Sequence, residues 1–295
     1  MNYKDGKWAK RILELQYDDG SWGYFHSLST LTPGQFSSMT TEQALRRLEI
    51  LGYTIDDKPV KKAVKYLHGC LAGKTKIPDR EEKTHNWKIY TELMLSTWIR
   101  IFTPENKLAN NVAAKWRELI GAAFRNGYYE HNEYTAKYEY IFGIKLNPKA
   151  GRLVDFVHFY PISLLTNVLD KEIEANYFKY VLEHDSGMYY IYDNKLKNVP
   201  ENFQSRNTSY YLRAIELLSK YDNPECKKQL QFVVKWLKGN MLTKNVWDMG
   251  KEAKDGIYLP LSDSWKMQED RIRDCTYRIS RALEALTVRS SLVGV

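Results

Sequence analysis

Apolar residues recur at helical spacing through most of this 295-residue chain, and three of the resulting segments resemble one another. Segments 41–51, 208–218 and 276–286 each begin with a threonine and continue as an apolar stripe with polar residues between. A threonine ahead of such a stripe is typical of a helix N-cap, where its hydroxyl accepts a backbone N–H. The pattern therefore predicts three capped amphipathic helices.

A short turn precedes each of these helices by 20 or 21 residues. The turns share a glycine with an aromatic residue two positions later, as in Gly20-Ser21-Trp22, Gly187-Met188-Tyr189 and Gly256-Ile257-Tyr258. Glycine readily adopts the left-handed backbone that ends a helix. The aromatic side chain is bulky enough to fill the gap between two helices. We therefore predict that Trp22, Tyr189 and Tyr258 each pack between neighbouring helices.

A second similarity extends the repeat to a pair of helices. Segments 63–69 and 233–239 match each other. Each follows one of the capped helices, at the place expected for its partner helix in a hairpin. An internal repeat of this kind predicts stacked helical hairpins, about five or six in this length of chain. Further predicted helices span 6–17, 84–102, 108–124, 132–142, 153–165 with a kink at Pro161, and 171–184.

Helical hairpins can stack into an open superhelix or close into a ring. An open solenoid needs polar capping repeats at both ends, and this sequence has none. No Gly/Ser-rich or Pro-rich linker divides the chain. We therefore predict an all-α fold, a single domain over residues 1–295, in which inner and outer rings of helices form an α/α toroid.

Composition excludes several classes of protein. No apolar run approaches the length of a membrane span, and the N-terminus has no apolar signal core, so we expect a cytoplasmic protein. Cys70, Cys226 and Cys275 show no CxxC spacing, which argues against a disulfide framework and against a zinc site. The net charge of +8 comes from scattered pairs such as Lys61-Lys62, without a nucleic-acid-binding motif. We expect no nucleic-acid partner and some attraction for a small anion.

One turn resembles a known family. Gln16-x-x-x-Gly20-x-Trp22 is similar to the QW repeat of terpenoid cyclases and of protein prenyltransferase β subunits. The resemblance implies the α/α toroid, a fold that also serves polysaccharide lyases and glycosidases. The acidic and zinc-binding signatures of the family are absent. Asp56-Asp57 is interpreted as a helix cap, and Asp274-Cys275 has no histidine after it, so we expect no metal and no cofactor.

In such a ring, functional residues are expected near the N-terminal ends of inner helices, where free backbone N–H groups face one end of the hollow. Asp155 and His158 are three residues apart, which on a helix places them on one face within an apolar run. A carboxylate that orients a histidine forms a general base, and Tyr160 or Tyr277 would supply an acid. The alternative is a buried polar pair that ties two helices together.

Three further segments are predicted to line the same hollow. Near residue 270, Arg271 and Arg273 would hold a phosphate or carboxylate, Asp274 joins the candidate catalytic residues, and salt bridges between helices are the alternative. The other candidate ligand-binding residues are His85, Asn86, Trp87, Tyr90, Arg206, Asn207, Tyr210 and Asp263.

These features favour a terpenoid cyclase-like or prenyltransferase-like toroid that binds a hydrophobic, anionic, isoprenoid-like ligand in a central aromatic cavity. The 22 tyrosines and 8 tryptophans would suit an isoprenoid chain, and they would equally stack against sugar rings. A polysaccharide lyase or glycoside hydrolase, with a glycan ligand, is therefore the first alternative. A non-catalytic binding or scaffold protein is the second, and the sequence leaves open whether the protein is an enzyme.

Overall fold

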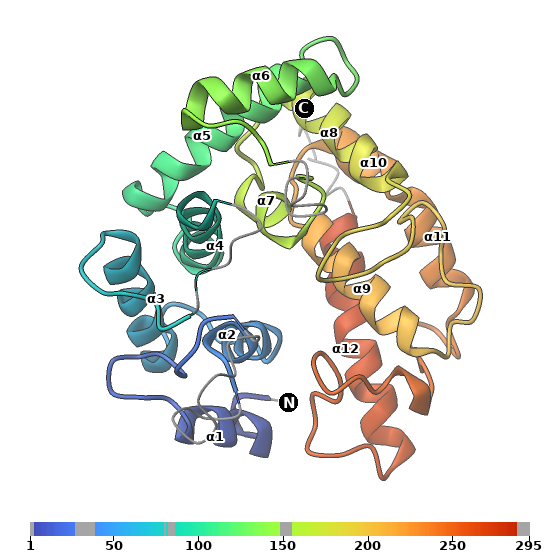
Figure 1. Ribbon diagram of the computed structural model, residues 1–295. Coiled ribbons are helices and arrows are strands. Elements are labelled where there is room, and N and C mark those ends of the chain that lie inside the picture. The colour runs from blue at the N-terminus through green and yellow to red at the C-terminus, as the bar shows by residue number, and fades with distance from the viewer. Residues whose placement is uncertain (1–2, 27–38, 80, 82–85, 148–154, 288–295) are drawn as a thin grey trace, which may run out of the picture.

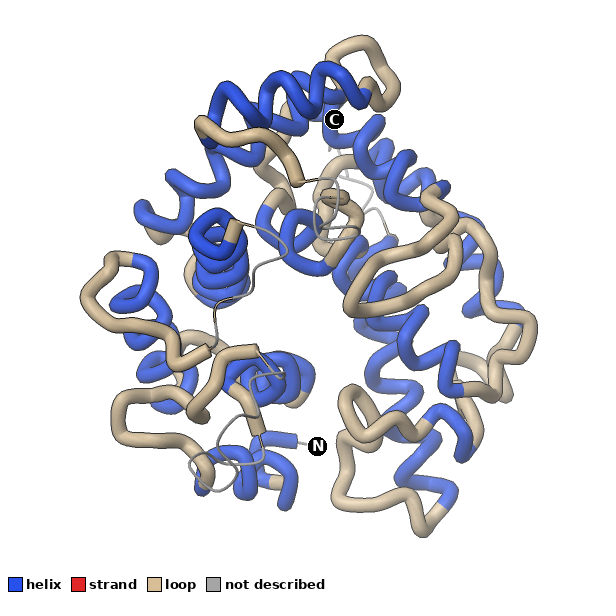
Figure 2. The backbone as a smooth tube through the Cα atoms, viewed as in Figure 1, coloured by secondary structure: helices blue, strands red, loops and turns tan. Residues whose placement is uncertain are grey.

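The computed structural model describes residues 3–26, 39–79, 81, 86–147 and 155–287. This part of the chain folds into α-helices joined by loops, and it contains isolated β-bridges but no strand (Figure 2). The all-α prediction is confirmed. The helices are α1 (Lys7–Glu14), α2 (Thr41–Ile50), α3 (Lys58–Leu71), α4 (Trp87–Phe102), α5 (Lys107–Ala123), α6 (His131–Phe142), α7 (Phe159–Leu164), α8 (Lys171–Glu183), α9 (Arg206–Leu218), α10 (Pro224–Gln229), α11 (Gln231–Gly239) and α12 (Gln268–Leu286).

Helices pack both against their neighbours in the chain and against helices further along it. Helix α4 packs against α3, α5 and α7, while α9 packs against α7 and α12. Figure 1 shows α2, α4, α7, α9 and α12 nearer the centre of the molecule, with α3, α5, α6, α8, α10 and α11 outside them. One hydrophobic core runs from Tyr3 to Leu286 through these layers. None of the described helices has both the length and the apolar character needed to cross a membrane.

The QW-like corner fastens α1 to the helices that follow it. The buried Trp22 donates its indole N–H to the carbonyl of Ile12, at 2.7 Å, while the Gln16 amide donates to the carbonyls of Gly20 and Pro59. Gly20 has a φ of +96°, and a Cβ there would lie 2.5 Å from the Lys62 carbonyl oxygen. Only glycine therefore fits this turn.

The same corner occurs again at Trp247, which the sequence pattern missed. Trp247 donates its indole N–H to the Leu237 carbonyl at 2.6 Å, ten residues earlier, as Trp22 does to Ile12. Its backbone N–H bonds to the Thr276 hydroxyl at 3.0 Å, as that of Trp22 does to Thr41. Trp247, and not Tyr258, is therefore the counterpart of Trp22.

The threonine cap predicted at Thr40 and Thr41 is confirmed at Thr40, but Thr41, Thr208 and Thr276 do not cap their helices. Thr40 caps α2 and Ser205 caps α9, whereas Thr276 lies in the interior of α12. Helix α12 starts earlier because the segment before Thr276 is itself helical, with acidic residues in its first turn that favour a helix start. Thr41 and Thr276 instead accept the backbone N–H of the tryptophan in the preceding turn.

Two of the three predicted aromatic plugs are confirmed. Trp22 lies between α1 and α2, and the ring of Tyr258 lies within 6 Å of Arg213 on α9 and Arg278 on α12. Tyr189 is only half-buried and stacks on Tyr190, with 4.1 Å between ring centroids. Its backbone pairs with residues 157–159, so its place is set by a β-bridge and not by a gap between helices.

Two helices differ in extent from the prediction. Helix α1 ends at Glu14, before the Gly20 turn. The predicted helix 153–165, where 153 and 154 lie outside the described residues, begins only at Phe159. Pro161 then falls in the first turn of α7 and produces no kink, because its missing N–H has no intrahelical partner at that position.

The N-terminal helices contact the loop that precedes α12. The amide of Lys7 donates to Asp263 at 2.8 Å, and the Trp8 indole donates to the Ser262 carbonyl at 3.0 Å. Arg47 on α2 donates to the carbonyl of Ile257 at 3.0 Å. Helices α1 and α2 are thus bonded to the loop that leads into α12.

Candidate functional site

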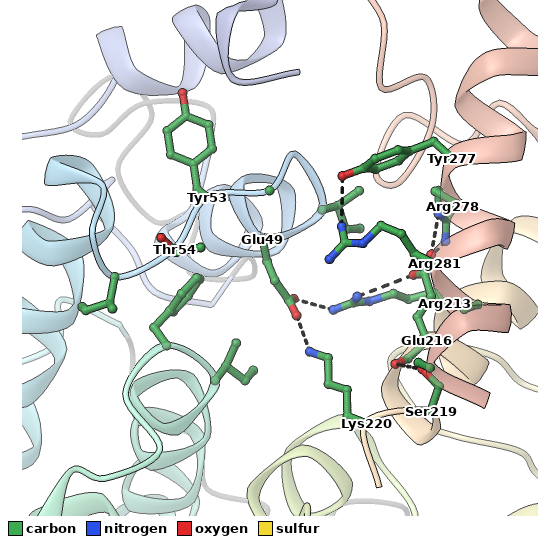
Figure 3. A pocket seen from close by; sticks show the side chains of 17 residues that line it. Glu49, Tyr53, Thr54, Arg213, Glu216, Ser219, Lys220, Tyr277, Arg278 and Arg281 are labelled. Carbon is green, nitrogen blue, oxygen red and sulfur yellow. Dashed lines mark hydrogen bonds and ion pairs between the residues drawn. The ribbon is translucent and has the colours of Figure 1, made fainter. Parts of the chain in front are cut away.

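A pocket of about 430 Å³ opens between α2, α4, α9 and α12 (Figure 3). Its volume lies within the range of small-molecule sites. We call it the cationic pocket. It is lined by Glu49, Ile50, Gly52, Tyr53, Thr54, Ile55, Ile101, Phe102, Arg213, Glu216, Ser219, Lys220, Tyr277, Arg278, Arg281, Ala282 and Ala285.

The pocket lies at the C-terminal ends of these helices. Helices α2 and α4 contribute their last turn or the residues just after it, α9 contributes residues from Arg213 onward, and α12 contributes residues from its last ten. These four helices therefore run toward the same end of the molecule. Backbone carbonyls at helix C-termini carry partial negative charge, which favours basic side chains in their last turns.

Two buried arginines and two carboxylates form a neutral network in the wall of the pocket. Arg213 donates to Glu49 at 2.6 Å and lies 3.6 Å from Glu216. Arg278 donates to both oxygens of Glu216, at 2.8 and 3.1 Å. The side chains of Arg213 and Arg278 are only 3% and 2% exposed, so water screens these contacts weakly.

Glu49 is ionised in this network. Burial alone would raise its pKa, but the charges of Arg213 and Lys220 outweigh burial and lower the pKa of Glu49 to about 2. A carboxyl group with so low a pKa cannot act as a general acid near neutral pH. Glu49 therefore serves as a fixed negative charge.

Two further cations project toward the opening. Lys220, whose side chain is 42% exposed, pairs with Glu49, and the exposed Arg281 donates to the Tyr277 hydroxyl at 3.2 Å. Arg281 has no carboxylate partner among the described residues. With Arg213 and Arg278 balanced by Glu49 and Glu216, the lining keeps a formal charge of +2. The opposite wall, formed by α2, the loop after it and α4, is largely apolar, with Ile50, Ile55, Ile101 and Phe102, while Ala282 and Ala285 add apolar surface on α12.

The helix C-termini reduce this positive charge. Each terminus contributes roughly half a negative charge, but the effect is screened by water and confined to the last turn. Long-range attraction for an anion is therefore modest. An anionic group would be held mainly by direct hydrogen bonds from Arg281 and Lys220.

Most of the sequence-predicted residues lie elsewhere. Of that set, Tyr277 lines the cationic pocket, and Tyr277 and Arg273 border a second, open depression along α12. His85 lies outside the described residues. Asn86 caps α4, Trp87 is the first residue of that helix, Arg206 and Asn207 lie in the first turn of α9, and Tyr210 contacts Tyr258 edge to face.

The structure brings Tyr90, His158 and Tyr160 together in a buried aromatic cluster. The Tyr160 ring lies 5.7 Å from Tyr90 and 5.8 Å from His158. Tyr190 completes the cluster, with its hydroxyl 3.0 Å from that of Tyr90. Tyr90 on α4 and Tyr160 on α7, both predicted as site residues, therefore contact each other in the buried core.

Glu42 is the acidic centre of this cluster, and the sequence analysis did not predict it. It accepts hydrogen bonds from Arg46 and Tyr160, both at 2.8 Å, and lies 3.9 Å from His26. Burial would raise the pKa of Glu42, but Arg46 and His26 lower it overall, so the group is a carboxylate. Arg46 also stacks on the Phe159 ring at 4.0 Å. The Glu42–Arg46 ion pair lies within α2, and the hydrogen bond from Tyr160 joins it to α7, so these contacts are also those of a buried polar group that holds two helices together.

Asp155 orients a histidine, but not the predicted one. Its carboxylate accepts from the Val157 amide at 3.0 Å and pairs with His184 at 2.8 Å. The predicted helical spacing fails because Asp155 and His158 both precede the first residue of α7. Burial raises the pKa of Asp155, while the hydrogen bond from His184 lowers it and prevails.

The charged residues near position 270 hold loops in place. Asp274 is fully buried and accepts from the Tyr3 hydroxyl, the Trp265 indole, the Ser262 hydroxyl and two backbone amides. Arg271 forms two hydrogen bonds of 2.6 Å with Asp248, and Arg273 pairs with Asp270. Each of these predicted site residues therefore has its partners within the chain.

A signal in the repeat could have identified the pocket. In each of the three matching helical segments the sixth residue is arginine and the ninth is glutamate. Arg213 and Arg281 at the sixth position and Glu49 and Glu216 at the ninth all line the cationic pocket. The same charged residue recurs at one position of several amphipathic helices, whatever its place relative to the apolar stripe. Such a recurrence indicates that these helices face a polar interior.

No three His, Cys, Asp or Glu side chains converge as metal ligands within the described residues. Comparisons with protein families, with curated proteins and with solved structures find no match to this chain, so its site is interpreted from its own geometry.

Proposed function

We propose that this protein is an α/α toroid that binds a small amphipathic anion in the cationic pocket. The ligand would have an apolar body against Ile101 and Phe102 and an anionic group beside Arg281 and Lys220. An isoprenoid-like chain with a phosphate or carboxylate group has this chemistry. The observation that carries the proposal is the +2 charge left at an opening with an apolar opposite wall.

Three observations support the toroid. Helices α2, α4, α9 and α12 end around one pocket, as parallel helices of an inner ring would. The corner at Trp22 recurs at Trp247 with the same hydrogen bonds. The loop before α12 is bonded to α1, which is the contact that a closed ring requires.

The charge of the lining favours an amphipathic anion over an uncharged glycan, because Arg281 and Lys220 suit an anionic group. Tyr53, Phe102 and Tyr277 suit a sugar ring as well as an apolar chain, so the aromatic content does not decide between the two ligands. The low pKa of Glu49 also argues against the protonated acid that glycoside hydrolysis needs.

Titration calorimetry with octyl phosphate tests the proposal, with octanol as the uncharged comparison. We expect octyl phosphate to bind and Arg281→Gln to weaken binding about tenfold or more, because a hydrogen bond to a charged group contributes about 1.5 to 3 kcal/mol. Arg117→Gln is the matched control, since Arg117 is an exposed arginine on α5, outside the pocket. Equal binding by the two variants would contradict the proposed site.

A further inference from the structure

Glu49 occupies the place where an anionic ligand would meet the cations of the pocket. It lies in the last turn of α2, and its two carboxylate oxygens accept from Arg213 and from Lys220. Figure 3 shows both side chains reaching Glu49 from the α9 side, while Arg281 extends from α12 toward the same opening. The Glu49 carboxylate therefore already makes the contact with Lys220 that the anionic group of a ligand would make.

The two contacts of Glu49 differ in strength. Arg213 is 3% exposed and holds Glu49 at 2.6 Å in a weakly screened environment. Lys220 is 42% exposed, and ion pairs open to water contribute little, because screening and side-chain entropy offset the attraction. Lys220 can therefore leave Glu49 at small cost, whereas Arg213 is expected to stay.

We propose that Glu49 is an internal competitor that sets the affinity of the cationic pocket for anions. Without ligand, Glu49 holds Lys220. When ligand binds, its anionic group takes over Lys220 and adds Arg281, while Glu49 keeps Arg213. This inference rests on the proposed function, since it assumes that anions bind here. The low pKa of Glu49 keeps the competitor charged throughout the physiological pH range.

Removal of the competing charge should strengthen binding. We expect Glu49→Gln to bind octyl phosphate about three to ten times more tightly than the native chain, because Lys220 is released and the repulsion between two anions is removed. Glutamine keeps the size of the side chain and a carbonyl oxygen for Arg213. If Glu49 served only to position Arg213, the same substitution would leave binding unchanged or weaken it.

A double-mutant cycle attributes the gain to Lys220. The affinities of the native chain, Glu49→Gln, Lys220→Gln and the double variant are compared by calorimetry, and most of the gain should disappear when Lys220 is absent. Glu225→Gln is the matched control, because Glu225 pairs with the exposed Lys228 outside the pocket and its loss changes the net charge equally. Thermal unfolding of each variant verifies that it is folded.

The outcomes separate this inference from the proposed function. If Lys220→Gln and Arg281→Gln weaken binding but Glu49→Gln does not strengthen it, the competitor role is overturned and the binding site stands. An equal gain from Glu225→Gln would reduce the effect to net charge and would also overturn it. Failure of both the native chain and Glu49→Gln to bind octyl phosphate would overturn the proposed function and this inference together.

Discussion

Trp22 and Trp247 each bury an indole ring and donate its N–H to a carbonyl near the end of a helix. A buried carbonyl that loses its donor cannot bond to water instead. Loss of the hydrogen bond therefore destabilises the fold by more than its formation stabilises it. Tyr258 is buried to a similar degree, but its hydroxyl makes no hydrogen bond to the described part of the chain. All three residues therefore stabilise the fold by burying an aromatic ring, but only the two tryptophans also donate a hydrogen bond to a buried carbonyl.

Replacement of the two tryptophans by phenylalanine should reveal this difference. We expect Trp22→Phe and Trp247→Phe each to lower the free energy of unfolding by about 2 to 3 kcal/mol, because each leaves a carbonyl unpaired and a small void. Tyr258→Phe should cost less than about 1 kcal/mol. Urea unfolding followed by circular dichroism measures all three without relying on tryptophan fluorescence. A loss from Tyr258→Phe as large as that from Trp247→Phe would contradict this assignment.

At the scale of single residues, the sequence predicted partners only where local spacing fixes them. Trp22 was found because Gln16 and Gly20 lie beside it. Trp247 was missed because Asn245, and not glycine, stands two residues before it, and because 29 residues, and not 19, separate it from its threonine. Asp155 was assigned to His158, its neighbour in sequence, while the structure pairs it with His184, which comes from the end of α8. Contacts between distant segments depend on how helices pack, which spacing alone does not encode.

At the scale of elements, each tryptophan turn is tied to an inner helix by a threonine hydroxyl. Thr41 accepts the backbone N–H of Trp22 and Thr276 that of Trp247, both at 3.0 Å. Helical periodicity predicted most helices, but it did not predict this use of the threonines, because an N-cap and an interior acceptor have the same sequence signature. The pocket was missed because helical periodicity does not show in which direction each helix runs. That direction decides which end of the helix faces the opening.

Loss of the threonine hydroxyl should loosen the turn without unfolding its helix. In Thr41→Val and Thr276→Val we expect the Trp22 and Trp247 amides, respectively, to exchange with solvent at least about tenfold faster, since a buried N–H without an acceptor costs about 1 to 3 kcal/mol. Hydrogen exchange resolved by NMR measures each amide. Thr135→Val is the control, because the Thr135 hydroxyl bonds only within its own helix, and it should leave both amides unchanged.

At the scale of the whole molecule, charged side chains connect segments that are far apart in the chain. Glu49 on α2 bonds to Arg213 on α9 and to Lys220 just after it, 164 and 171 residues away. Asp274 on α12 accepts from Tyr3 near the N-terminus, 271 residues away. These contacts join α2 to α9 and the N-terminal residues to α12, and the first of them forms part of the wall of the cationic pocket.

Acid should therefore weaken the link between α2 and α9 in a way that depends on Glu49. Its pKa is about 2 in the folded protein and 4.5 as an ordinary glutamate, so the unfolded chain binds a proton first as pH falls. The stabilisation is complete above pH 4.5 and is lost as pH drops toward 2, an effect on the order of 2 to 3 kcal/mol. Urea unfolding at a series of pH values should show a steeper loss of stability below pH 4.5 for the native chain than for Glu49→Gln. Glu225→Gln should follow the native chain, and parallel curves for all three proteins would show that Glu49 does not carry this link.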